Sequence, residues 1–197
     1  MFTGLTQAIG TVENIKDAGE GYRVRIKAST FFDDDELGDS INVSGACLTI
    51  ESLRDDGTAE FFLSEETLER TWFDQLEEGD QLNLEKALTP RDRMGGHMVQ
   101  GHIEGCSTIE EVEELEEGWN MTFSLPEGLG KYIVEKGFVA VEGISLTVTQ
   151  VSETGFSVTV IPETWKETNL SEKKEGDSVN VETDVMARYA EEMLEGR

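Results

Sequence analysis

The sequence predicts an all-β protein made of two copies of one domain, followed by a single helix. Three observations support this fold class. Short motifs recur along the chain at an almost constant spacing, and runs of alternating apolar and polar residues are separated by glycine-containing or charged turns about every 8 to 12 residues. Only the last segment has helical periodicity. The chain has 197 residues, enough for two domains of about 100 residues each.

The internal repeat divides the chain into two halves. The motifs recur at an offset of 97 residues, or 98 in one case; the matched pairs are Gly4 with Gly101, residues 44–49 with 142–147, 66–68 with 163–165, 78–80 with 175–177, and 83–85 with 180–182. Ordered matches over the whole length indicate duplication of one domain. We therefore expect domains at residues 1–96 and 97–184 and a terminal helix at 185–197.

Within each copy the pattern is that of short strands in a sandwich or barrel. Residues 22–26, 81–84 and 156–160 alternate between apolar and polar side chains. In residues 41–50 the apolar phase changes at Gly45, and residues 139–148 show the same change at the corresponding glycine. Because successive side chains of a strand point to opposite faces, this phase change predicts a β-bulge or a bend at the glycine.

Beyond this predicted bend, the two copies carry equivalent small polar pairs. They are Cys47 with Thr49 in the first copy and Ser145 with Thr147 in the second. Only the first pair has a thiol, and this chemical difference between the copies is the most useful clue to function.

The final segment predicts an amphipathic helix. Asp184 is a candidate N-cap. The residues that follow it and form one apolar face are Val185, Met186, Tyr189, Ala190, Met193 and Leu194. Such a helix packs either on its own barrel or against another subunit, and the sequence leaves both open.

Composition limits the class of partner. The chain has 42 acidic and 16 basic residues, a net charge of −26, so binding to nucleic acid is not expected. No apolar run approaches the roughly 18 residues of a membrane span, and no export signal is visible at the start, so we expect a cytoplasmic protein without a membrane partner. Two cysteines, Cys47 and Cys106, suit free thiols in a reducing compartment, although their pairing stays open.

The acidic residues occur in clusters, at residues 33–36, 77–80 and 110–117. Solvated loops and strand edges explain such clusters. A second hypothesis is a halophilic protein, in which high salt screens the repulsion among the carboxylates.

Six segments, in order along the chain, resemble the riboflavin synthase family. They are Met1-Phe2-Thr3-Gly4-Leu5, the strand motif at 44–49, the inter-domain segment 95–105 with sequence GGHMVQGHIEG, the second strand motif at 142–148, and the segments 161–164 and 168–170. The resemblance covers essentially the whole chain. It implies two six-stranded Greek-key barrels in tandem, a C-terminal helix and a homotrimer.

The resemblance also implies the reaction. Two molecules of 6,7-dimethyl-8-ribityllumazine are held together, and a four-carbon unit passes from one to the other, giving riboflavin and 5-amino-6-(D-ribitylamino)uracil. No cofactor and no metal ion take part. In the family the substrates lie between the N-terminal barrel of one subunit and the C-terminal barrel of its neighbour.

Family roles carry over to matching positions in each half. The N-terminal pocket is expected to involve Gly4, Leu5, Thr6, Cys47, Leu48, Thr49, Phe62, Leu63, Ser64, Glu65, Glu66 and Thr67. The C-terminal pocket is expected to involve Gly101, His102, Ile103, Lys136, Ser145, Leu146, Thr147, Thr159, Val160, Ile161, Pro162, Glu163 and Thr164. Backbone groups would read the pyrimidine edge, while hydroxyls and Lys136 hold the ribityl chain or the ring.

The candidates for chemistry are His102, Cys47 and Ser40, in that order. An imidazole exchanges protons near neutral pH, and a thiol can polarise or add to the acceptor ring. Each also has a purely structural interpretation: a histidine at a domain junction, a small residue packed in a barrel, and a hydroxyl at the start of a strand. His97 is more simply explained as structural.

Three further residues are ambiguous or depart from the family. We expect Cys106 in the core, and Lys136 either contacts the ligand or pairs with a carboxylate such as Glu135. Ser44 stands where the family commonly has asparagine.

The main alternative function is a lumazine- or flavin-binding protein of the same fold that does not turn its ligand over. Such proteins depart from the enzymes at catalytic positions. Here Cys47, His102, Ser145 and Thr147 are all present, which favours the enzyme.

Overall fold

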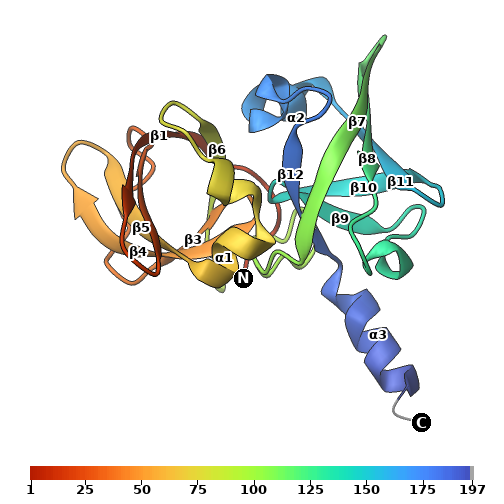
Figure 1. The fold of residues 1–197 in the computed structure, drawn as a ribbon, viewed down its shortest axis with the longest axis horizontal. Helices are drawn as coiled ribbons and strands as arrows, with labels where there is room; N and C mark the ends of the chain where they lie inside the picture. The colour runs from red at the N-terminus through yellow and green to blue at the C-terminus, as the bar shows by residue number, and fades with distance from the viewer. Residues whose placement is uncertain (196–197) are drawn as a thin grey trace.

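The computed structural model describes residues 1–195 and contains two closed six-stranded antiparallel barrels beside each other, with a helix projecting from the second (Figure 1). The first barrel consists of β1 (Ala8–Asp17), β2 (Gly21–Lys27), β3 (Ser40–Val43), β4 (Ala46–Arg54), β5 (Thr58–Ser64) and β6 (Gln81–Lys86). The second consists of β7 (Gly105–Leu115), β8 (Gly118–Ser124), β9 (Phe138–Val141), β10 (Ile144–Val151), β11 (Gly155–Val160) and β12 (Ser178–Thr183). The predicted fold class is confirmed.

Both barrels have the same Greek-key topology. Their strand orders are β1-β2-β5-β4-β3-β6 and, starting from the matching strand, β7-β8-β11-β10-β9-β12. The sixth strand returns to lie beside the third, which is the Greek-key arrangement. Closing the sheet leaves no unpaired edge strand.

Short helices connect the last two strands of each barrel. In the first barrel they are α1 (Glu65–Arg70) and η1 (Trp72–Gln75), and in the second α2 (Pro162–Glu167) and η3 (Asn169–Glu172). A further short helix, η2 (Gly130–Tyr132), precedes β9 only in the second barrel.

The glycine at which the apolar phase changes lies in a tight turn, so the expected bulge or bend is wrong. Val43 pairs with Ala46, and Ser44 and Gly45 form a two-residue turn between antiparallel strands β3 and β4. Both turn residues have positive φ, 41° and 96°, as hairpin turns that match the strand twist require. Glu142 and Gly143 form the equivalent turn, with φ of 51° and 76°.

True register shifts lie elsewhere, at places where the sequence pattern gave no sign of them. In the first barrel they occur between Val12 and Asn14 and between Ile50 and Ser52. The second barrel repeats both shifts, at residues 109–111 and 148–150. Because bulges increase twist and bend a strand, these repeated positions shape both barrels in the same way.

The last helix, α3 (Val185–Glu195), projects away from the barrels (Figure 1). Asp184 Oδ1 accepts a hydrogen bond from Met186 N at 2.9 Å, which confirms the predicted N-cap. The last two residues of the predicted segment, Gly196 and Arg197, lie outside the described residues. Within the predicted apolar face of α3, Val185 is buried, whereas Met186, Tyr189, Met193 and Leu194 are 59 to 74 % exposed.

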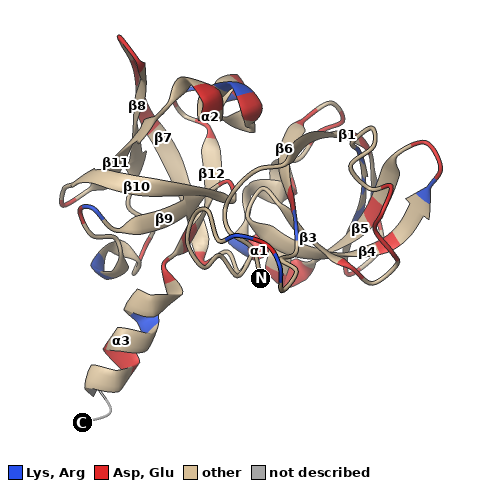
Figure 2. Cartoon of the chain, turned by 180° about the vertical axis from the view of Figure 1, so that it is seen from behind, with Lys and Arg blue, Asp and Glu red and all other residues tan. Residues whose placement is uncertain are grey.

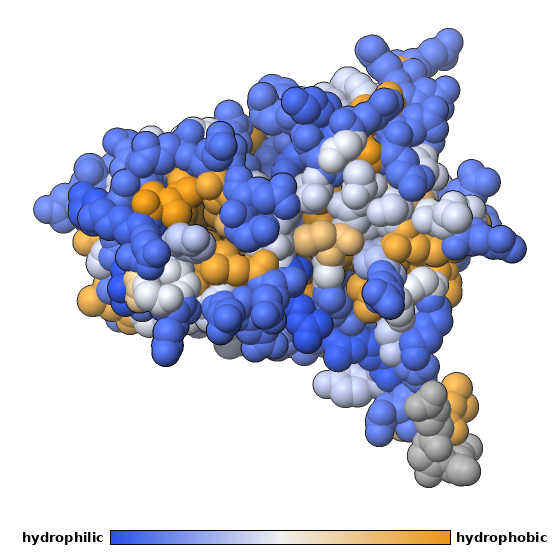
Figure 3. Space-filling view, in the orientation of Figure 1, coloured by the Kyte–Doolittle hydropathy of each residue, from blue (hydrophilic) through white to orange (hydrophobic). Residues whose placement is uncertain are grey.

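Acidic residues are spread over strands and loops of both barrels rather than gathered in one place (Figure 2). The face seen in Figure 3 is mostly hydrophilic, with smaller hydrophobic patches. The described residues include no helix long and apolar enough to cross a membrane.

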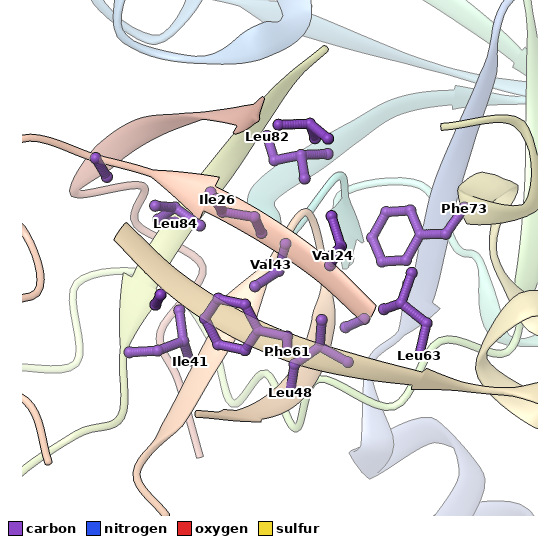
Figure 4. Close-up of a cluster of buried hydrophobic side chains, with 14 of the residues drawn as sticks. Val24, Ile26, Ile41, Val43, Leu48, Phe61, Leu63, Phe73, Leu82 and Leu84 are labelled. Carbon is purple, nitrogen blue, oxygen red and sulfur yellow. The ribbon is translucent and has the colours of Figure 1, made fainter. Parts of the chain in front are cut away.

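Each barrel has its own hydrophobic core. In the first, Val24, Ile26, Phe61, Leu82 and Leu84 all point inward (Figure 4) and are essentially inaccessible to solvent. The equivalent interior of the second barrel is filled by residues that include Met121, Phe123 and Phe156. Since burying one such side chain contributes about 1.5–3 kcal/mol, each barrel has a substantial core of its own.

The barrels meet through a buried polar interface that follows the internal repeat. Asn83 of β6 accepts a hydrogen bond from Asn169 N at 2.7 Å and donates to Glu142 O at 2.9 Å. Its counterpart in the second copy, Asn180 of β12, accepts from Trp72 N at 3.1 Å and donates to Ser44 O at 2.9 Å. One asparagine side chain of each final strand thus forms hydrogen bonds with the other barrel. These bonds fix how the two barrels lie relative to each other.

Candidate active site

The segment that joins the two barrels contacts strand β4 of the first one. Cys47 N donates a hydrogen bond to Gly101 O at 2.8 Å. Gly101 has a φ of +82°, and a Cβ placed there would lie 2.6 Å from the Cβ of Cys47. Only glycine allows the backbone to turn here and to approach the strand so closely.

A buried carboxylate holds this turn in place. Glu182 of β12 accepts hydrogen bonds from the backbone N–H groups of Gln100, Gly101 and His102 at 2.7 to 2.8 Å. Burial raises the pKa of Glu182, and these three donors partly oppose the shift. The second barrel therefore positions a segment that serves the first.

A pocket of about 250 Å³ opens between this segment, β4 and α1. It brings Cys47, which is half-buried, together with His102, which is exposed. The complete lining is Ala46, Cys47, Leu48, Glu66, Thr67, Arg70, Thr71, Gly101, His102 and Ile103. A thiol and an imidazole at the mouth of one pocket can polarise a bound ring and exchange a proton with it.

The short helix α1 contributes one wall of the pocket. Ser64 caps the helix, and its hydroxyl accepts a hydrogen bond from Thr67 N at 3.2 Å. At the other end the hydroxyl of Thr71 donates to Thr67 O at 2.6 Å. These contacts fix the helical turn that carries Glu66, Thr67 and Arg70.

The start of the chain makes the equivalent contact with the second barrel. Ser145 N donates to Gly4 O at 2.8 Å, and a Cβ on Gly4 would lie 2.6 Å from that of Ser145. Glu85, the counterpart of Glu182, accepts from Thr3 N at 2.7 Å and Gly4 N at 3.0 Å.

This exchange corrects the expected division of the site. From the sequence, residues 4–6 belonged to the first barrel's pocket and 101–103 to the second barrel's. The structure places Gly4 against Ser145 and residues 101–103 against Cys47. The reason is geometric: each segment precedes the first strand of its own barrel and crosses to the neighbouring barrel before that strand begins.

Ser145 also pairs with a histidine that the sequence had left as structural. His97 Nδ1 lies 2.7 Å from Ser145 Oγ, and the imidazole stacks on the ring of Phe138 at 5.2 Å between centroids. Burial lowers the pKa of His97, although Asp184 partly opposes the shift, so its neutral form is favoured. His97 Nε2 is buried and has no hydrogen-bond partner among the described residues.

The two half-sites therefore each combine one imidazole with one small polar residue, but the imidazoles come from different positions. His102 has Leu5 as its counterpart at the offset of 97 residues. His97 serves the second barrel in its place. An internal comparison of the copies cannot reveal His97, because its counterpart would precede Met1.

Ser40 lies in the same sheet as Cys47 but outside the pocket lining. It pairs with Thr49 across strands β3 and β4. Thr49 is on the exposed face that also carries Cys47, whereas Leu48 is buried. Ser40 therefore lies beside Thr49, which is two residues along β4 from Cys47.

The other predicted residues of the first half differ in how they are placed. Glu66 and Thr67 line the pocket, and Ser64 supports them. Leu63 is 1 % exposed and packs in the barrel core, so its side chain is not available to a ligand. Phe62 is half-buried and contacts the Arg23 guanidinium at 5.5 Å. In the initial segment Leu5 is exposed and Thr6 is half-buried, and Glu65 at the start of α1 is exposed.

In the second half, Thr147 is exposed on the face that carries Ser145, while Leu146 and Val160 are buried in the core. Most of the remaining predicted residues are open to solvent: Thr159, Ile161, Pro162 and Glu163, with Thr164 half-buried. Lys136 is exposed, its backbone N–H donates to Val148 O at 2.8 Å, and it forms no ion pair within residues 1–195.

Neither cysteine is in a disulfide. Cys106 is half-buried beside the barrel interface rather than in the middle of a core, with Sγ 3.6 Å from Arg70 O. Burial raises the pKa of its thiol to about 11, with a further contribution from Glu142. It is therefore a poor nucleophile at neutral pH.

Sequence reasoning missed Ala46, Arg70 and Thr71 in the pocket lining. Arg70 lies one helical turn after Glu66 and on the same face, so the helical spacing could have revealed it. Ala46 and Thr71 gave no comparable sign. Within residues 1–195 no group of three or more histidine, cysteine, aspartate or glutamate side chains is arranged to hold a metal ion.

Comparison with known proteins agrees with this duplicated architecture. The lumazine-binding domain matches the chain twice, at residues 3–87 and 100–184. Over 195 residues the chain is 40 % identical to the riboflavin synthase of Actinobacillus pleuropneumoniae, covering 98 % of this chain and 90 % of that protein. The chain belongs to the riboflavin synthase family. The riboflavin synthase of Brucella abortus is 41 % identical over 196 residues, with 96 % of both chains covered.

Solved structures extend the riboflavin synthase comparison to bound ligands. The crystal structure of LumP complexed with riboflavin has a TM-score of 0.87 and 25 % identity, covering 93 % of this chain and 99 % of that one. LumP has also been solved in complex with 6,7-dimethyl-8-(1′-D-ribityl)lumazine, with a TM-score of 0.84.

Proposed function

We propose that this chain, as a member of the riboflavin synthase family, converts two molecules of 6,7-dimethyl-8-ribityllumazine into riboflavin and 5-amino-6-(D-ribitylamino)uracil. The reaction moves a four-carbon unit from one substrate molecule to the other. The observation that carries the proposal is the pair of related half-sites, one with Cys47 and His102 and the other with Ser145 and His97. Two copies of one substrate need two related places to bind, and the duplicated domain provides them.

The substrate itself supplies much of the reactivity. Its 7-methyl protons are acidic because the carbanion is delocalised into the electron-poor lumazine ring. The protein therefore has to bring the two rings together, assist proton transfer and stabilise the adduct. Holding both rings in a fixed orientation removes much of the entropic barrier of a reaction between two molecules.

We assign His102 to proton exchange with the bound ring and Cys47 to polarisation of, or transient addition to, the acceptor ring. Ser40 is assigned to the neighbourhood of the reacting rings because it lies beside Thr49 on the strand next to Cys47. The hydroxyls of Thr49, Thr67 and Thr147 and the Lys136 ammonium would hold the ribityl chains or the ring edges.

The buried members of the predicted site have another role. Leu48, Leu63, Leu146 and Val160 face the cores, so they would support the ligand through their backbone groups. Segment 101–103, held by Glu182, would bring further backbone groups to the half-site with Cys47. Segment 4–6, held at Gly4 by Glu85, would do the same for the half-site with Ser145.

The proposed ligands are 6,7-dimethyl-8-ribityllumazine and riboflavin, and no cofactor is needed for the transfer. The bound ligands of LumP support both. A binding protein without turnover is not favoured, because relatives that match nearly the full chain at about 40 % identity are riboflavin synthases.

We further propose a homotrimer in which α3 supplies subunit contacts. The helix leaves Met186, Tyr189, Met193 and Leu194 exposed, and burial of such side chains is the usual basis of a stable interface. In this assembly, the half-site of one subunit that contains Cys47 and His102 faces the half-site of its neighbour that contains Ser145 and His97. The free thiols of Cys47 and Cys106 fit a reducing compartment, which supports the cytoplasm as the place of action.

The substitution His102→Gln tests the assignment of the chemistry. Glutamine keeps a hydrogen-bonding side chain but cannot exchange a proton near neutral pH. We expect kcat to fall by about a hundredfold, while the Kd for riboflavin changes less than about threefold. An unchanged kcat would remove His102 from the mechanism.

A further inference from the structure

His97 is a buried histidine to which the proposed reaction assigns no task. Its imidazole is 5 % exposed and stacks on the ring of Phe138, and Nδ1 lies 2.7 Å from Ser145 Oγ. Ser145 itself is half-buried near the start of β10, and its hydroxyl forms no other hydrogen bond within residues 1–195. The pair therefore joins a buried imidazole to a hydroxyl that a ligand can reach.

The backbone around His97 holds this pair in place. His97 N donates a hydrogen bond to Thr3 O at 3.2 Å, and Glu85 in turn accepts from Thr3 N at 2.7 Å. The chain also packs closely on Ser145 from this side, since a Cβ on Gly96 would lie 2.7 Å from the Cβ of Ser145. The contact between Nδ1 and Oγ is thus fixed by backbone contacts on both sides.

The surroundings of the other ring nitrogen determine which nitrogen carries the proton. Burial lowers the pKa of His97, and a neutral imidazole has one N–H donor and one acceptor nitrogen. His97 Nε2 is buried and has no hydrogen-bond partner among the described residues; Asp184 acts on the ring through its charge but does not reach this nitrogen. A proton on Nε2 would therefore be a buried donor without a protein acceptor. Folded proteins avoid such donors more strictly than unused acceptors.

The proton of the neutral ring therefore belongs on Nδ1, and this determines the role of the Ser145 hydroxyl. Nδ1–H donates to Oγ, so the O–H bond of Ser145 points away from the imidazole. Within the described part of the chain no protein group accepts this O–H. Because Ser145 is half-buried, the O–H is available to a bound molecule.

We propose that His97 is a positioning residue whose Nδ1–H fixes Ser145 as a hydrogen-bond donor to an acceptor atom of the lumazine ring. This inference rests on the proposed function for the identity of the ligand. Cys47, the counterpart of Ser145, has a thiol, which is a weak donor, and no hydrogen bond joins its Sγ to a histidine within residues 1–195. The two half-sites therefore treat their two identical ligands differently.

The oriented hydroxyl contributes more to turnover than to binding. When a lumazine ring loses a 7-methyl proton, negative charge spreads onto the oxygen and nitrogen acceptors of the ring. A donor that is already oriented toward such an acceptor gains strength as this charge develops. The hydrogen bond from His97 also polarises the Ser145 hydroxyl and makes it a better donor.

The first experiment determines the tautomer directly. The full-length chain is labelled with ¹⁵N at histidine, and its imidazole signals are recorded by NMR at about pH 8. The chain has only two histidines, so the variant His97→Asn assigns both sets of signals. We expect a protonated Nδ1 and an unprotonated Nε2 for His97. A proton on Nε2 overturns the inference, whether or not the chain turns over lumazine.

The second experiment separates positioning from packing. The amide nitrogen of asparagine can take the place of Nδ1, whereas leucine has a similar size and no donor. We expect kcat of His97→Asn to stay within about threefold of the native value and kcat of His97→Leu to fall about tenfold, as loss of one hydrogen bond predicts. The Kd for riboflavin should change less than about threefold in both variants. If His97→Leu does not fold, His97→Gln replaces it, because the glutamine amide reaches the position of Nε2 instead.

The same pair of substitutions is then made in Ser145→Ala, where the hydroxyl is absent. There we expect the difference in kcat between asparagine and leucine at position 97 to disappear. Equal kcat values in the two single variants, or a difference that persists in Ser145→Ala, would show that His97 only fills space. A native chain that shows the expected tautomer but does not turn over lumazine would contradict the proposed function and, with it, the role of the hydroxyl in turnover.

Discussion

The surroundings of His97 in the folded protein determine its protonation state. The imidazole is buried, stacked on Phe138 and within hydrogen-bonding distance of Ser145. Because desolvation lowers its pKa, the folded protein binds the proton of His97 less readily than the unfolded chain does. The imidazole of His97 is therefore mainly neutral near pH 7.

This shift predicts a pH dependence of stability. As the pH falls below the ordinary histidine value of 6.5, the unfolded chain takes up a proton that the folded protein resists, so the free energy of unfolding decreases. The decrease continues down to the lowered pKa of the folded state. In His97→Gln this contribution is absent, so the difference in free energy of unfolding between the native chain and the variant narrows as the pH falls from 7.5.

Urea unfolding at a series of pH values measures this difference. The variant His102→Gln, which replaces the exposed histidine, serves as the control. A difference that stays constant between pH 7.5 and pH 5 for His97→Gln would contradict the burial argument.

At the scale of single residues, chemistry was easier to predict than environment. Cys47 and His102 were recognisable in the sequence, and they line one pocket. His97 was not recognised as part of a half-site, because its contact with Ser145 spans 48 residues and exists only after both barrels have formed. Leu63 and Val160 were named as site residues, although the alternation of their strands turns their side chains into the cores.

Among the elements, the two crossing segments determine the geometry of the site. The turn at Gly101 meets Cys47 so closely that any side chain would collide with it. The variant Gly101→Ala is therefore expected to lose stability by about 1 kcal/mol or more from strain at positive φ alone. It should also lose riboflavin affinity, because the added methyl group pushes the segment away from the pocket.

Gly38→Ala is the matched control. Gly38 has a similar φ of +94°, but a Cβ there meets nothing within 4 Å. Both variants should be strained, and only Gly101→Ala should weaken riboflavin binding, by at least about tenfold. Equal riboflavin affinity in the two variants would mean that the segment does not shape the pocket.

The elements also show the limit of reading a periodic pattern. The phase change at Gly45 predicted an irregular strand, but the chain reverses direction there. An irregular strand and a tight turn both change which side chains face the core. Only the pairing of Val43 with Ala46 shows that the chain turns here. Likewise, the repeat predicted that Gly4 and Gly101 are equivalent, but not that each crosses to the other barrel, because the repeat contains no information about contacts between copies.

At the scale of the whole molecule, the charge of −26 determines how stability depends on salt. Acidic residues cover both barrels, and their mutual repulsion opposes folding (Figure 2). Raising the ionic strength from about 0.01 M to 1 M shortens the screening length from roughly 30 Å to 3 Å. If the protein is halophilic, Tm rises steadily over this range of KCl. A flat Tm would exclude adaptation to high salt.

The duplicated architecture predicts complementation between inactive variants. If a site combines the first barrel of one subunit with the second barrel of its neighbour, Cys47→Ser and Ser145→Ala damage opposite halves. Co-refolded in equal amounts, they should regain about a quarter of the native activity, since about one interface in four joins two intact halves.

Activity of the mixture that merely equals the mean of the two variants would mean that each site lies within one chain. A mixture of Cys47→Ser with His102→Gln is the control. Both of these residues line the first barrel's pocket, so no interface gains activity.

The stoichiometry of turnover decides whether the chain acts as a riboflavin synthase. The purified chain is incubated with 6,7-dimethyl-8-ribityllumazine, without oxygen or added cofactor and in molar KCl, while flavin absorbance and loss of substrate are followed. We predict one riboflavin for every two substrate molecules consumed. Tight binding of the substrate with a change in its fluorescence but no riboflavin would contradict the claim and point to a binding protein of the same fold.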